Sequence, residues 1–531
     1  MPKHLLRHLP LLVLLGACLG LGTSQTAGLT WPHDADLYRN MAQAQVMADG
    51  DWFADPYYRD EKAWYNPLTP ATIALLNRAT GIAIPRLYAQ AGTLLNLAVP
   101  AAFYLLAHAF FGRLTALFAT VYVVFLGHPG EASWMRPAYG PWFFAGTLGQ
   151  AFFSLGLVAY ARALEAKDRR GFVITGVLLG LAFLSHTAPA VLLGGVVVLE
   201  LLRTGLARPQ PGPPVRLLQH VLLFAVAFAV SMPFLATILG VYRLRVVNPA
   251  GNDWFWWPFE LGHFVPYVVG HVSISAFVAV AGLLQIARRS AQVGNRLVLL
   301  FLALAVAFVL YGLLSQWAAA RGVHLLNLVA PHHFWLYMKA AGALGWGHAV
   351  ASLLRAARAY VAPAAWTQGW STAVLATFAF VASLLGLPTL AARDDFARSG
   401  GEARRESAKA WRDSIRTFLR AHAAATDVVL ADPDDALMVV GPTGRKTVAV
   451  LANFANPYVA AAPREEAARA MIAALEAEDD TTFLALAVRY RVTWVLHRRT
   501  GRVGLDRRAL PFLVRELREG PFILYRVASS P

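Results

Sequence analysis

The sequence predicts a mainly α-helical fold: a polytopic membrane helical bundle of about eleven spans, followed by a small exported C-terminal α/β domain. Of the 531 residues, 57% are apolar and only 15% are charged, and the mean hydropathy is +0.48. A soluble chain of this length needs far more polar surface, so the composition indicates repeated passage through a membrane. Long apolar runs recur up to residue 392, and short strand and helix patterns follow.

Each expected span is an apolar run close to the roughly 20 residues that cross a hydrocarbon core. The runs lie at 7–27, 88–111, 113–128, 142–162, 171–186, 187–203, 217–240, 264–286, 297–315, 333–354 and 368–392. The run at 113–128 and the pair at 171–203 are short or interrupted by polar residues. The pair therefore admits a second interpretation, as re-entrant or tilted elements.

The charges of the loops orient the bundle. With the N-terminus in the cytoplasm, every loop expected inside is basic, as the positive-inside rule requires. The loops then expected outside are 29–87, 129–141, 241–263 and 316–332. Arg heavily outnumbers Lys, which resembles a high-GC bacterial protein. We therefore expect a multi-pass protein of the bacterial plasma (inner) membrane, with a cytoplasmic N-terminus and an extracytoplasmic C-terminal domain.

The first span has an alternative interpretation. Leu15–Cys18 resembles the end of a lipoprotein signal, in which Cys18 would carry a lipid, whereas a retained helix is the simpler interpretation. Both leave the loop 29–87 outside. Cys18 is the only cysteine, which excludes an intrachain disulfide framework and a thiolate metal cluster. The net charge of +16 does not indicate nucleic-acid binding, because the basic residues form short clusters rather than a continuous stripe.

The pattern changes after residue 392. We expect a membrane body over 1–392, with the acidic first outer loop at 29–87, and an extracytoplasmic α/β domain over 393–531. Within the latter, 393–405 reads as a charged linker. Helical patterns follow at 406–424, 436–440, 467–478, 481–490 and 507–519, and strand patterns at 427–430, 446–451, 492–496 and 522–527.

The loop 29–87 concentrates acids and aromatic residues on a body that otherwise has few acids. It opens with Asp34 and Asp36 directly after the first span. An Asp-x-Asp pair can hold a divalent cation through hard oxygen ligands, or one carboxylate can act as general base toward a hydroxyl. The alternative for Asp34 is structural, because it precedes a helical pattern over 35–46 and is a good N-cap residue.

Several short motifs of this loop carry a resemblance. They are the early Asp pair, Tyr38-Arg39-Asn40-Met41-Ala42, Gly50-Asp51-Trp52 and Tyr65-Asn66-Pro67. With the many spans and the exported C-terminal domain, the chain resembles the integral-membrane C-type glycosyltransferases. These include oligosaccharyltransferases, protein O-mannosyltransferases and lipid A aminoarabinose transferases.

The resemblance implies an enzyme that transfers a sugar from a polyprenyl-phosphate-linked donor to an acceptor at the outer face of the plasma membrane. The family uses a carboxylate of the first outer loop, here Asp34 or Asp36. The acceptor is left open as a glycan, a lipid or a protein. The chain lacks the Trp-Trp-Asp motif of oligosaccharyltransferases, which argues against protein N-glycosylation.

The resemblance also implies a divalent cation, Mg²⁺ or Mn²⁺, in the metal-using members of the family. There a second acidic loop completes the cation site. In this chain Glu131 is the only carboxylate of the second outer loop, so Asp36 and Glu131 are the candidate ligands. The alternative for Glu131 is a surface ion pair with Arg136.

A phosphate leaving group needs fixed positive charge. Candidates gather near the outer end of the tenth span: Arg321, His332, His333 and Lys339. Inside an apolar helix the charge of Lys339 costs at least ~2.5 kcal/mol unless it is compensated. A phosphate would compensate it, and so would snorkelling to the interface. Further candidate substrate-binding residues are Tyr65, Arg136 and His186, the last of which could instead be a satisfied buried histidine.

Two other functions fit the same membrane architecture. One is a transporter or flippase of a lipid-linked substrate, which predicts half-repeats and charges at mid-membrane. The other is a non-catalytic assembly or sensor protein whose C-terminal domain binds a partner. The chain shows no repeat, and its acids lie in a loop outside the membrane core, which favours the glycosyltransferase.

Overall fold

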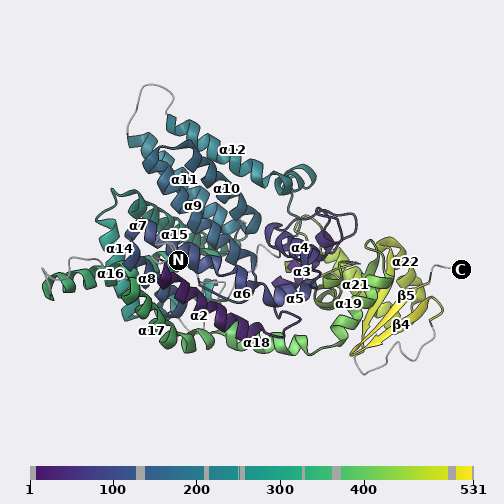
Figure 1. Cartoon of the computed structure of the whole chain (residues 1–531). Coiled ribbons are helices and arrows are strands. Elements are labelled where there is room, and N and C mark those ends of the chain that lie inside the picture. The colour runs from purple at the N-terminus through teal and green to yellow at the C-terminus, as the bar shows by residue number, and fades with distance from the viewer. Residues whose placement is uncertain are drawn as a thin grey trace. The chain divides into compact units, whose positions relative to one another are not determined.

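The computed structural model describes residues 8–126, 138–207, 215–248, 250, 257–323, 325, 329–361, 372–499 and 510–528. The chain is mainly helical and has one five-stranded sheet near its C-terminus (Figure 1). It divides into two compact units. Unit 1 comprises Met1–Ala27, Gln90–Met232 and Phe255–Gly401, and unit 2 comprises Gly28–Ala89, Pro233–Trp254 and Glu402–Pro531. The acidic loop thus groups with the C-terminal residues.

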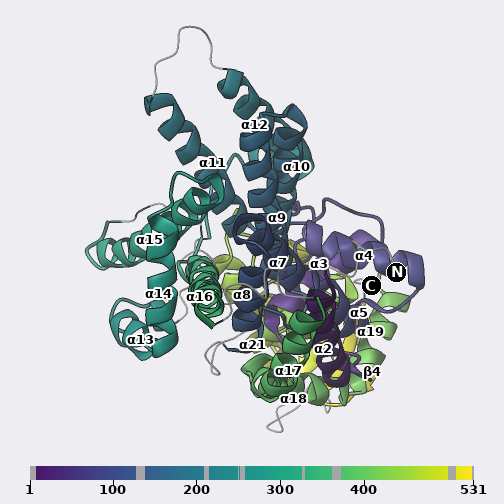
Figure 2. The same ribbon diagram turned by 60° about the vertical axis from the view of Figure 1, so that its left-hand side comes forward.

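The apolar helices occupy all the runs expected to be spans. They are α2 (Leu9–Thr26), α5 (Ile84–Gln90), α6 (Gly92–Leu95), α7 (Ala98–Phe111), α8 (Arg113–Phe125), α9 (Ala145–Ala166), α10 (Arg169–Ser185), α11 (Thr187–Ala207), α12 (Val215–Leu235) with the π-helix η2 (Ala236–Val241), α13 (Phe264–Gly270), α14 (Ile274–Ala287), α15 (Val293–Ala319), α16 (His332–Val361) and α17 (Thr372–Ala391). Several neighbours in sequence, such as α9, α10 and α11, lie side by side (Figures 1 and 2).

The number of spans is not confirmed. Within the described residues, six helices are long and apolar enough to cross a membrane, or seven if the bent pair α13 and α14 counts as one span. The two helices of that pair meet at 91°, and Figure 2 shows this sharp turn. Helices α8 and α10, with 13 and 17 residues, are shorter than the roughly 20 that a span needs.

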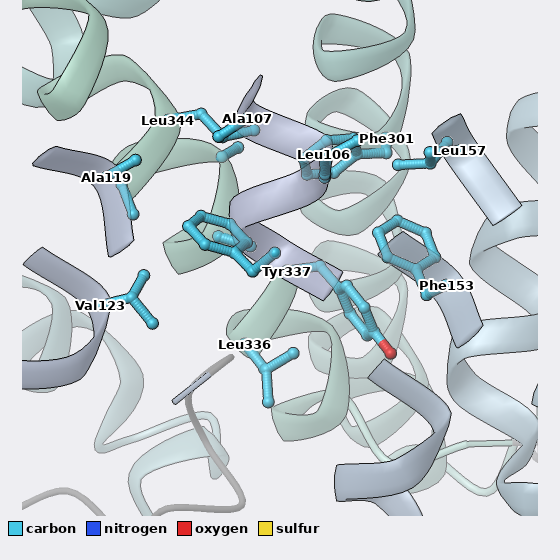
Figure 3. Close-up of a cluster of buried hydrophobic side chains, with 14 of the residues drawn as sticks. Leu106, Ala107, Ala119, Val123, Phe153, Leu157, Phe301, Leu336, Tyr337 and Leu344 are labelled. Carbon is cyan, nitrogen blue, oxygen red and sulfur yellow. The ribbon is translucent and has the colours of Figure 1, made fainter. Parts of the chain in front are cut away.

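The core of unit 1 is built from apolar side chains of α7, α8, α9, α15 and α16 (Figure 3). The ring of Phe153 packs edge-on against Tyr337, with centroids 4.7 Å apart, and against Phe301 at 5.6 Å. Helices α14 and α16 approach closely where Gly282 faces Gly345: a Cβ on Gly282 would lie 1.8 Å from the Gly345 carbonyl oxygen. Small residues at such crossings let backbones meet, as is typical of packed membrane helices.

Unit 2 is organised around a mixed sheet. Its elements are α3 (Ala35–Ala48), α4 (Leu68–Thr80), α19 (Trp411–His422), β1 (Val428–Leu430), α20 (Pro433–Asp435), η4 (Ala436–Val440), η5 (Gly441–Thr443), β2 (Lys446–Thr447), η6 (Ala452–Phe454), α21 (Ala462–Ala477), α22 (Asp480–Tyr490), β3 (Val492–Arg498), β4 (Leu513–Glu519) and β5 (Phe522–Val527). The strand order is β2-β1-β3-β5-β4; β1 pairs in parallel with β2 and β3, and β5 pairs antiparallel with β3 and β4.

Successive side chains along a strand point to opposite faces of the sheet, and both faces of this sheet carry apolar side chains. Trp494 and Leu496 of β3 pack with α19 and with Tyr57 of the acidic loop. Val495, between them, packs with α21 and α22 on the other face. The α/β character expected after residue 392 is therefore present, with helices on both faces of the sheet.

Two local expectations were wrong. The expected linker 393–405 forms a helix, α18 (Asp394–Ser407), whose acidic first turn and basic last turn complement the helix dipole. The expected helix 507–519 contains instead the strand β4, which pairs with β5. The pairing of β4 with β5 outweighs the helical spacing of apolar residues in this segment. Residues 500–509 lie outside the described residues.

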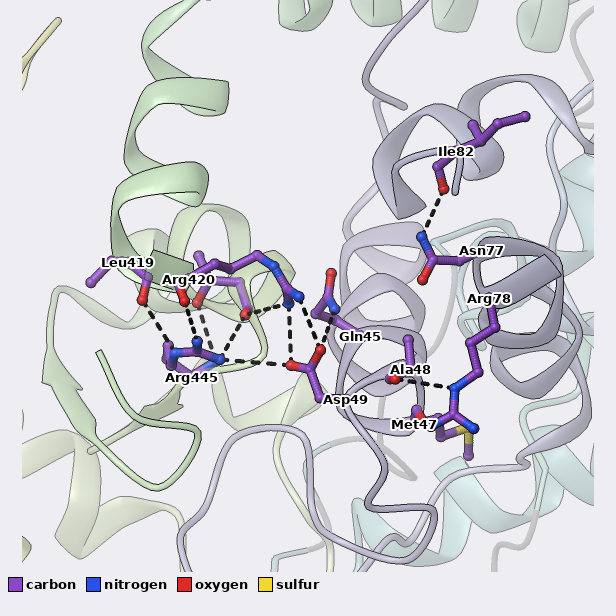
Figure 4. Close-up of polar contacts among 11 residues, drawn as sticks. Gln45, Met47, Ala48, Asp49, Asn77, Arg78, Ile82, Leu419, Arg420 and Arg445 are labelled. Atoms are coloured by element: carbon purple, nitrogen blue, oxygen red, sulfur yellow. Dashed lines mark hydrogen bonds and ion pairs between the residues drawn. The ribbon is translucent and has the colours of Figure 1, made fainter. Parts of the chain in front are cut away.

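Ion pairs tie α3 to the C-terminal segments within unit 2 (Figure 4). Arg420 of α19 donates two hydrogen bonds to the Asp49 carboxylate, at 3.0 and 3.1 Å. Arg445 lies 3.7 Å from the same carboxylate and also donates to the carbonyl oxygens of Leu419 and Arg420. The end of α3 is thus held by two arginines of the C-terminal segments.

A second tie is centred on Asp55, which is fully buried. Its Oδ1 accepts hydrogen bonds from the backbone N–H groups of Tyr57 and Tyr58, at 2.7 and 2.8 Å. Its Oδ2 accepts one from Asn456 Nδ2 at 2.8 Å, and its backbone carbonyl oxygen accepts one from Lys446 Nζ. The carboxylate is therefore satisfied from both sides, which burial of a charge requires.

Replacing Asn456 tests this tie. Asn456→Ala leaves Asp55 Oδ2 buried without its side-chain donor, so we expect the free energy of unfolding to fall by about 1–3 kcal/mol, measured as a lower thermal midpoint in detergent. The control is Asn77→Ala, which removes only a surface hydrogen bond to the Ile82 carbonyl oxygen. Equal midpoints for the two variants would contradict a stabilising role for the tie.

Candidate functional site

The candidate site begins where α3 begins. Asp34 has extended backbone angles, and its Oδ1 accepts a hydrogen bond from the Asp36 N–H at 2.8 Å. Asp34 is thus the N-cap of α3, which confirms the structural interpretation of this residue. Its second carboxylate oxygen is not needed for capping, so capping and a chemical role are compatible.

Asp36 forms an ion pair on the same helix. Its Oδ1 lies 2.7 Å from Nη2 of Arg39, one turn later. The Arg39 side chain is 9% exposed and that of Asp36 is 50% exposed. The guanidinium lies 3.6 Å from the centroid of the Tyr65 ring and 5.8 Å from that of Phe454. Aromatic faces attract such a cation and hold it in place.

Two residues of this group were not singled out from the sequence as site residues. Arg39 belongs to the motif Tyr38–Ala42, to which the sequence assigns no role, although its position three residues after Asp36 on a helix is a recognisable ion-pair spacing. Phe454 comes from a segment more than 400 positions later in the chain, and nothing local in the sequence indicates its proximity. Tyr65, by contrast, was predicted as a substrate-binding residue, and the structure places it against Arg39.

The environment of Asp34 favours its neutral form. The pKa of its carboxyl is raised from 3.8 to about 7. Burial is the largest cause and the charge of Asp36 adds to it, while the hydrogen bond from Asp36 N–H and the charge of Arg39 act in the opposite direction. Within the described part of the chain, no ion pair joins Asp34 to a basic side chain. The two carboxylates therefore differ: Asp36 is paired, and Asp34 is poised to exchange a proton near neutral pH.

A divalent cation at this site would need oxygen ligands in addition to Asp36. Among the described residues, no group of three or more His, Cys, Asp and Glu side chains is arranged to hold a metal ion. Asp36 already faces the Arg39 guanidinium. Glu131, the second expected ligand, and Arg136 lie outside the described residues. The described side chains do not form a cation site by themselves, so no step is derived through a metal.

Unit 1 brings three predicted histidines together. His186 is the residue after α10, and His332 and His333 begin α16. The ring centroids of His186 and His333 are 4.6 Å apart, and those of His332 and His333 are 4.2 Å apart. His186 Nδ1 also accepts a hydrogen bond from the Ala188 N–H at 3.2 Å.

The other two predicted residues of unit 1 take different positions. Lys339 is partly buried on α16, two turns after the histidines, with Nζ 5.6 Å from the centroid of Trp335. Arg321 follows α15 and is exposed. Its guanidinium covers the Trp317 ring at 3.8 Å and donates to the Trp317 carbonyl oxygen, so its described contacts are local.

Comparison with known proteins identifies structures that share the fold of this chain. No family model matches the sequence, and no curated protein matches it. Among solved structures, ArnT from Cupriavidus metallidurans bound to undecaprenyl phosphate is similar, with a TM-score of 0.54 and 13% identity over 98% of this chain and 99% of that chain. The apo oligosaccharyltransferase of Archaeoglobus fulgidus has a TM-score of 0.52 and 13% identity over 92% of this chain and 69% of that chain.

A third similar structure is the arabinofuranosyltransferase AftD from Mycobacteria. Its TM-score is 0.50, with 14% identity over 98% of this chain and 40% of that chain. All three are C-type membrane glycosyltransferases. The chain therefore has the fold of that group, and the resemblance seen in its sequence is confirmed at the level of fold.

The shifted pKa of Asp34 predicts how stability depends on pH. Because the folded value, about 7, lies above the unfolded value of 3.8, the folded protein is stabilised by the protonated form, and this stability is lost as pH rises from about 4 to 7. Asp34→Asn keeps the cap and removes the charge. We expect the thermal midpoint of the native protein to fall relative to that of the variant between pH 4 and pH 7. Above pH 7 the difference between the two midpoints should stay constant. A constant difference from pH 4 to 8 would contradict the shift.

Proposed function

We propose that the chain transfers a sugar from a polyprenyl-phosphate-linked donor to an acceptor at the outer face of the bacterial plasma membrane, with Asp34 as general base. The observation that carries the proposal is the pair at the start of α3, on a fold shared with lipid-linked sugar transferases. Asp36 is paired with Arg39, and among the described residues Asp34 keeps a carboxylate oxygen that neither the cap nor an ion pair uses.

Each carboxylate then has its own role. A general base must accept a proton without losing a strong ion pair, and an aspartate already paired with an arginine is poorly suited to that. Asp36 instead orients Arg39 and supplies a fixed negative charge beside Asp34. The pKa of Asp34, about 7, supports this assignment, because the best base titrates close to the working pH.

The proposed reaction is a single displacement at the anomeric carbon of the donor. Asp34 takes the proton of an acceptor hydroxyl as its oxygen forms the new glycosidic bond. The bond between the anomeric carbon and the phosphate oxygen breaks, and its electron pair leaves with polyprenyl phosphate. The developing negative charge on that phosphate requires fixed positive charge.

Several parts of the proposal rest on the sequence. His332, His333 and Lys339 of unit 1 are the proposed partners of the carrier phosphate, with Arg321, His186, Tyr65 and Arg136 as further substrate-binding residues. ArnT, which has the same fold, binds undecaprenyl phosphate. A divalent cation held by Asp36 and Glu131 remains a prediction, as do the identities of the sugar and the acceptor.

The test is transfer by the purified full chain in lipid nanodiscs. The probes are undecaprenyl-phosphoryl mannose, glucose, galactose, arabinose and aminoarabinose, and release of undecaprenyl phosphate is followed by mass spectrometry. We expect Asp34→Asn to lower kcat by about 10²–10⁴-fold, because it removes the proton acceptor and keeps the N-cap.

The matched control is Asp60→Asn, in the same loop. The Asp60 carboxylate is 74% exposed and pairs with Arg491 at the surface, so we expect its kcat to stay within about twofold of the native value. Full activity of correctly folded Asp34→Asn would exclude Asp34 as the base.

A further inference from the structure

One face of α3 is polar and yet buried. Asp36, Arg39, Asn40 and Gln43 are spaced i, i+3, i+4 and i+7, which places them on a single stripe of the helix. Asn40 is 1% exposed and Gln43 is 2% exposed. A buried helix face normally carries apolar side chains, because the polar groups of amides lose their water when they are buried.

Four buried polar atoms of this stripe lack a hydrogen-bond partner among the described residues. In the described part of the chain, Arg39 Nε, Asn40 Oδ1 and both amide atoms of Gln43 make no hydrogen bond. Most buried polar side-chain atoms in proteins are hydrogen-bonded, so four such atoms close together on one helix stripe call for an explanation.

The opposite face of the same helix does not share this property. Tyr38 is fully buried, and its hydroxyl donates to the Pro32 carbonyl oxygen at 3.1 Å. Gln45 is 3% exposed, and its Nε2 donates to Asp49 Oδ1 at 2.9 Å. Burial of α3 therefore does not by itself leave its polar groups without partners. Among the described residues, the unpartnered polar atoms of α3 lie on the face that carries Asp36.

Tyr57 adds a hydroxyl to this group. Its side chain is fully buried, and within the described residues its hydroxyl makes no hydrogen bond. The Tyr57 ring belongs to the same buried cluster as Ala42 of α3. It comes from the acidic loop rather than from α3, so two separate segments bring unpartnered polar atoms to the candidate site.

We propose that Asn40, Gln43 and Tyr57 form a subsite that binds the hydroxyl groups of the donor's sugar ring. The inference rests on the proposed function, and it assigns the specificity-determining residues of that site. Asn40 and Gln43 lie on α3, the helix that Asp34 caps, and Tyr57 lies in the segment that follows it.

The chemistry of the group selects a sugar rather than an anion. Two amides and a phenol supply both donors and acceptors, which matches vicinal hydroxyl groups that also donate and accept. The carbonyl oxygens of Asn40 and Gln43 would repel the oxygens of a phosphate, and the charge of Arg39 is already balanced by Asp36. A neutral polyhydroxylated ring offers both donors and acceptors to these atoms.

The experiment measures binding without turnover. The probes are bare undecaprenyl phosphate and the undecaprenyl-phosphoryl sugar that the native full chain binds most tightly in the panel above. Tyr57→Phe removes only the hydroxyl, and Gln43→Met replaces the amide by an apolar side chain of similar size. We expect each to weaken binding of the sugar-bearing carrier by about 3- to 10-fold, while the bare carrier binds as before.

Stability separates this role from a structural one. Because the replaced atoms have no hydrogen-bond partner among the described residues, we expect the thermal midpoints of Tyr57→Phe and Gln43→Met to be equal to or higher than the native midpoint. Tyr38→Phe, which loses a hydrogen bond to Pro32, should lower it. Tyr58→Phe is the matched control, because the buried ring of Tyr58 faces Arg464 at 4.3 Å. We expect this variant to bind the sugar-bearing carrier as tightly as the native protein does.

Other outcomes decide between sources of the sugar. A subsite for an acceptor saccharide would leave the donor preference native and raise the half-saturating concentration of methyl glycoside acceptors. Native values in both assays, or a midpoint that falls as far as that of Tyr38→Phe with binding unchanged, would overturn the proposal. Full transfer by Asp34→Asn would be a separate result, because it would contradict the proposed function. The ratio of the affinities for the sugar-bearing and the bare carrier does not depend on that result.

Discussion

The ion pair between Asp36 and Arg39 is the interaction on which the candidate site depends. Without the Arg39 guanidinium, the start of α3 would carry two neighbouring carboxylates and no cation to balance either of them. With it, the charge of Asp36 is balanced at 2.7 Å, and the pair becomes two groups of different chemistry. Tyr65 and Phe454 flank the guanidinium, so its place is set by aromatic side chains from both the acidic loop and the C-terminal segments.

This dependence gives the C-terminal segments a role in the candidate site itself. They contact the acidic loop through Asp49, through Asp55 and through Ser407, whose hydroxyl accepts hydrogen bonds from the N–H groups of Thr30 and Trp31 at 3.0 Å each. The same segments supply Phe454 beside Arg39. A domain that only bound a partner would not need so many polar contacts with the loop. The buried contact at Asp55 costs desolvation, which is offset only when all of its partners are in place.

Local patterns in the sequence predict much of this arrangement. The helix after Asp34, its N-cap and the apolar runs follow from spacing and composition, and the structure contains them. What the sequence could not supply depends on contacts between distant segments. Phe454 reaches Arg39, and β4 forms because β5 offers it a partner. The charged residues 394–407 looked like a linker because polarity was given more weight than their helical charge pattern. The unpartnered atoms of Asn40 and Gln43 become visible only when burial is known.

The central claim is that this fold and carboxylate pair move a sugar from a lipid carrier to a component of the cell envelope. The most direct test compares extracted glycolipids and glycans of a strain that lacks the gene with the same strain carrying either the native chain or Asp34→Asn. We expect that one glycan modification disappears in the strain that lacks the gene, that its polyprenyl-linked precursor accumulates, and that only the native chain restores the parental pattern. Identical extracts from all the strains would contradict it.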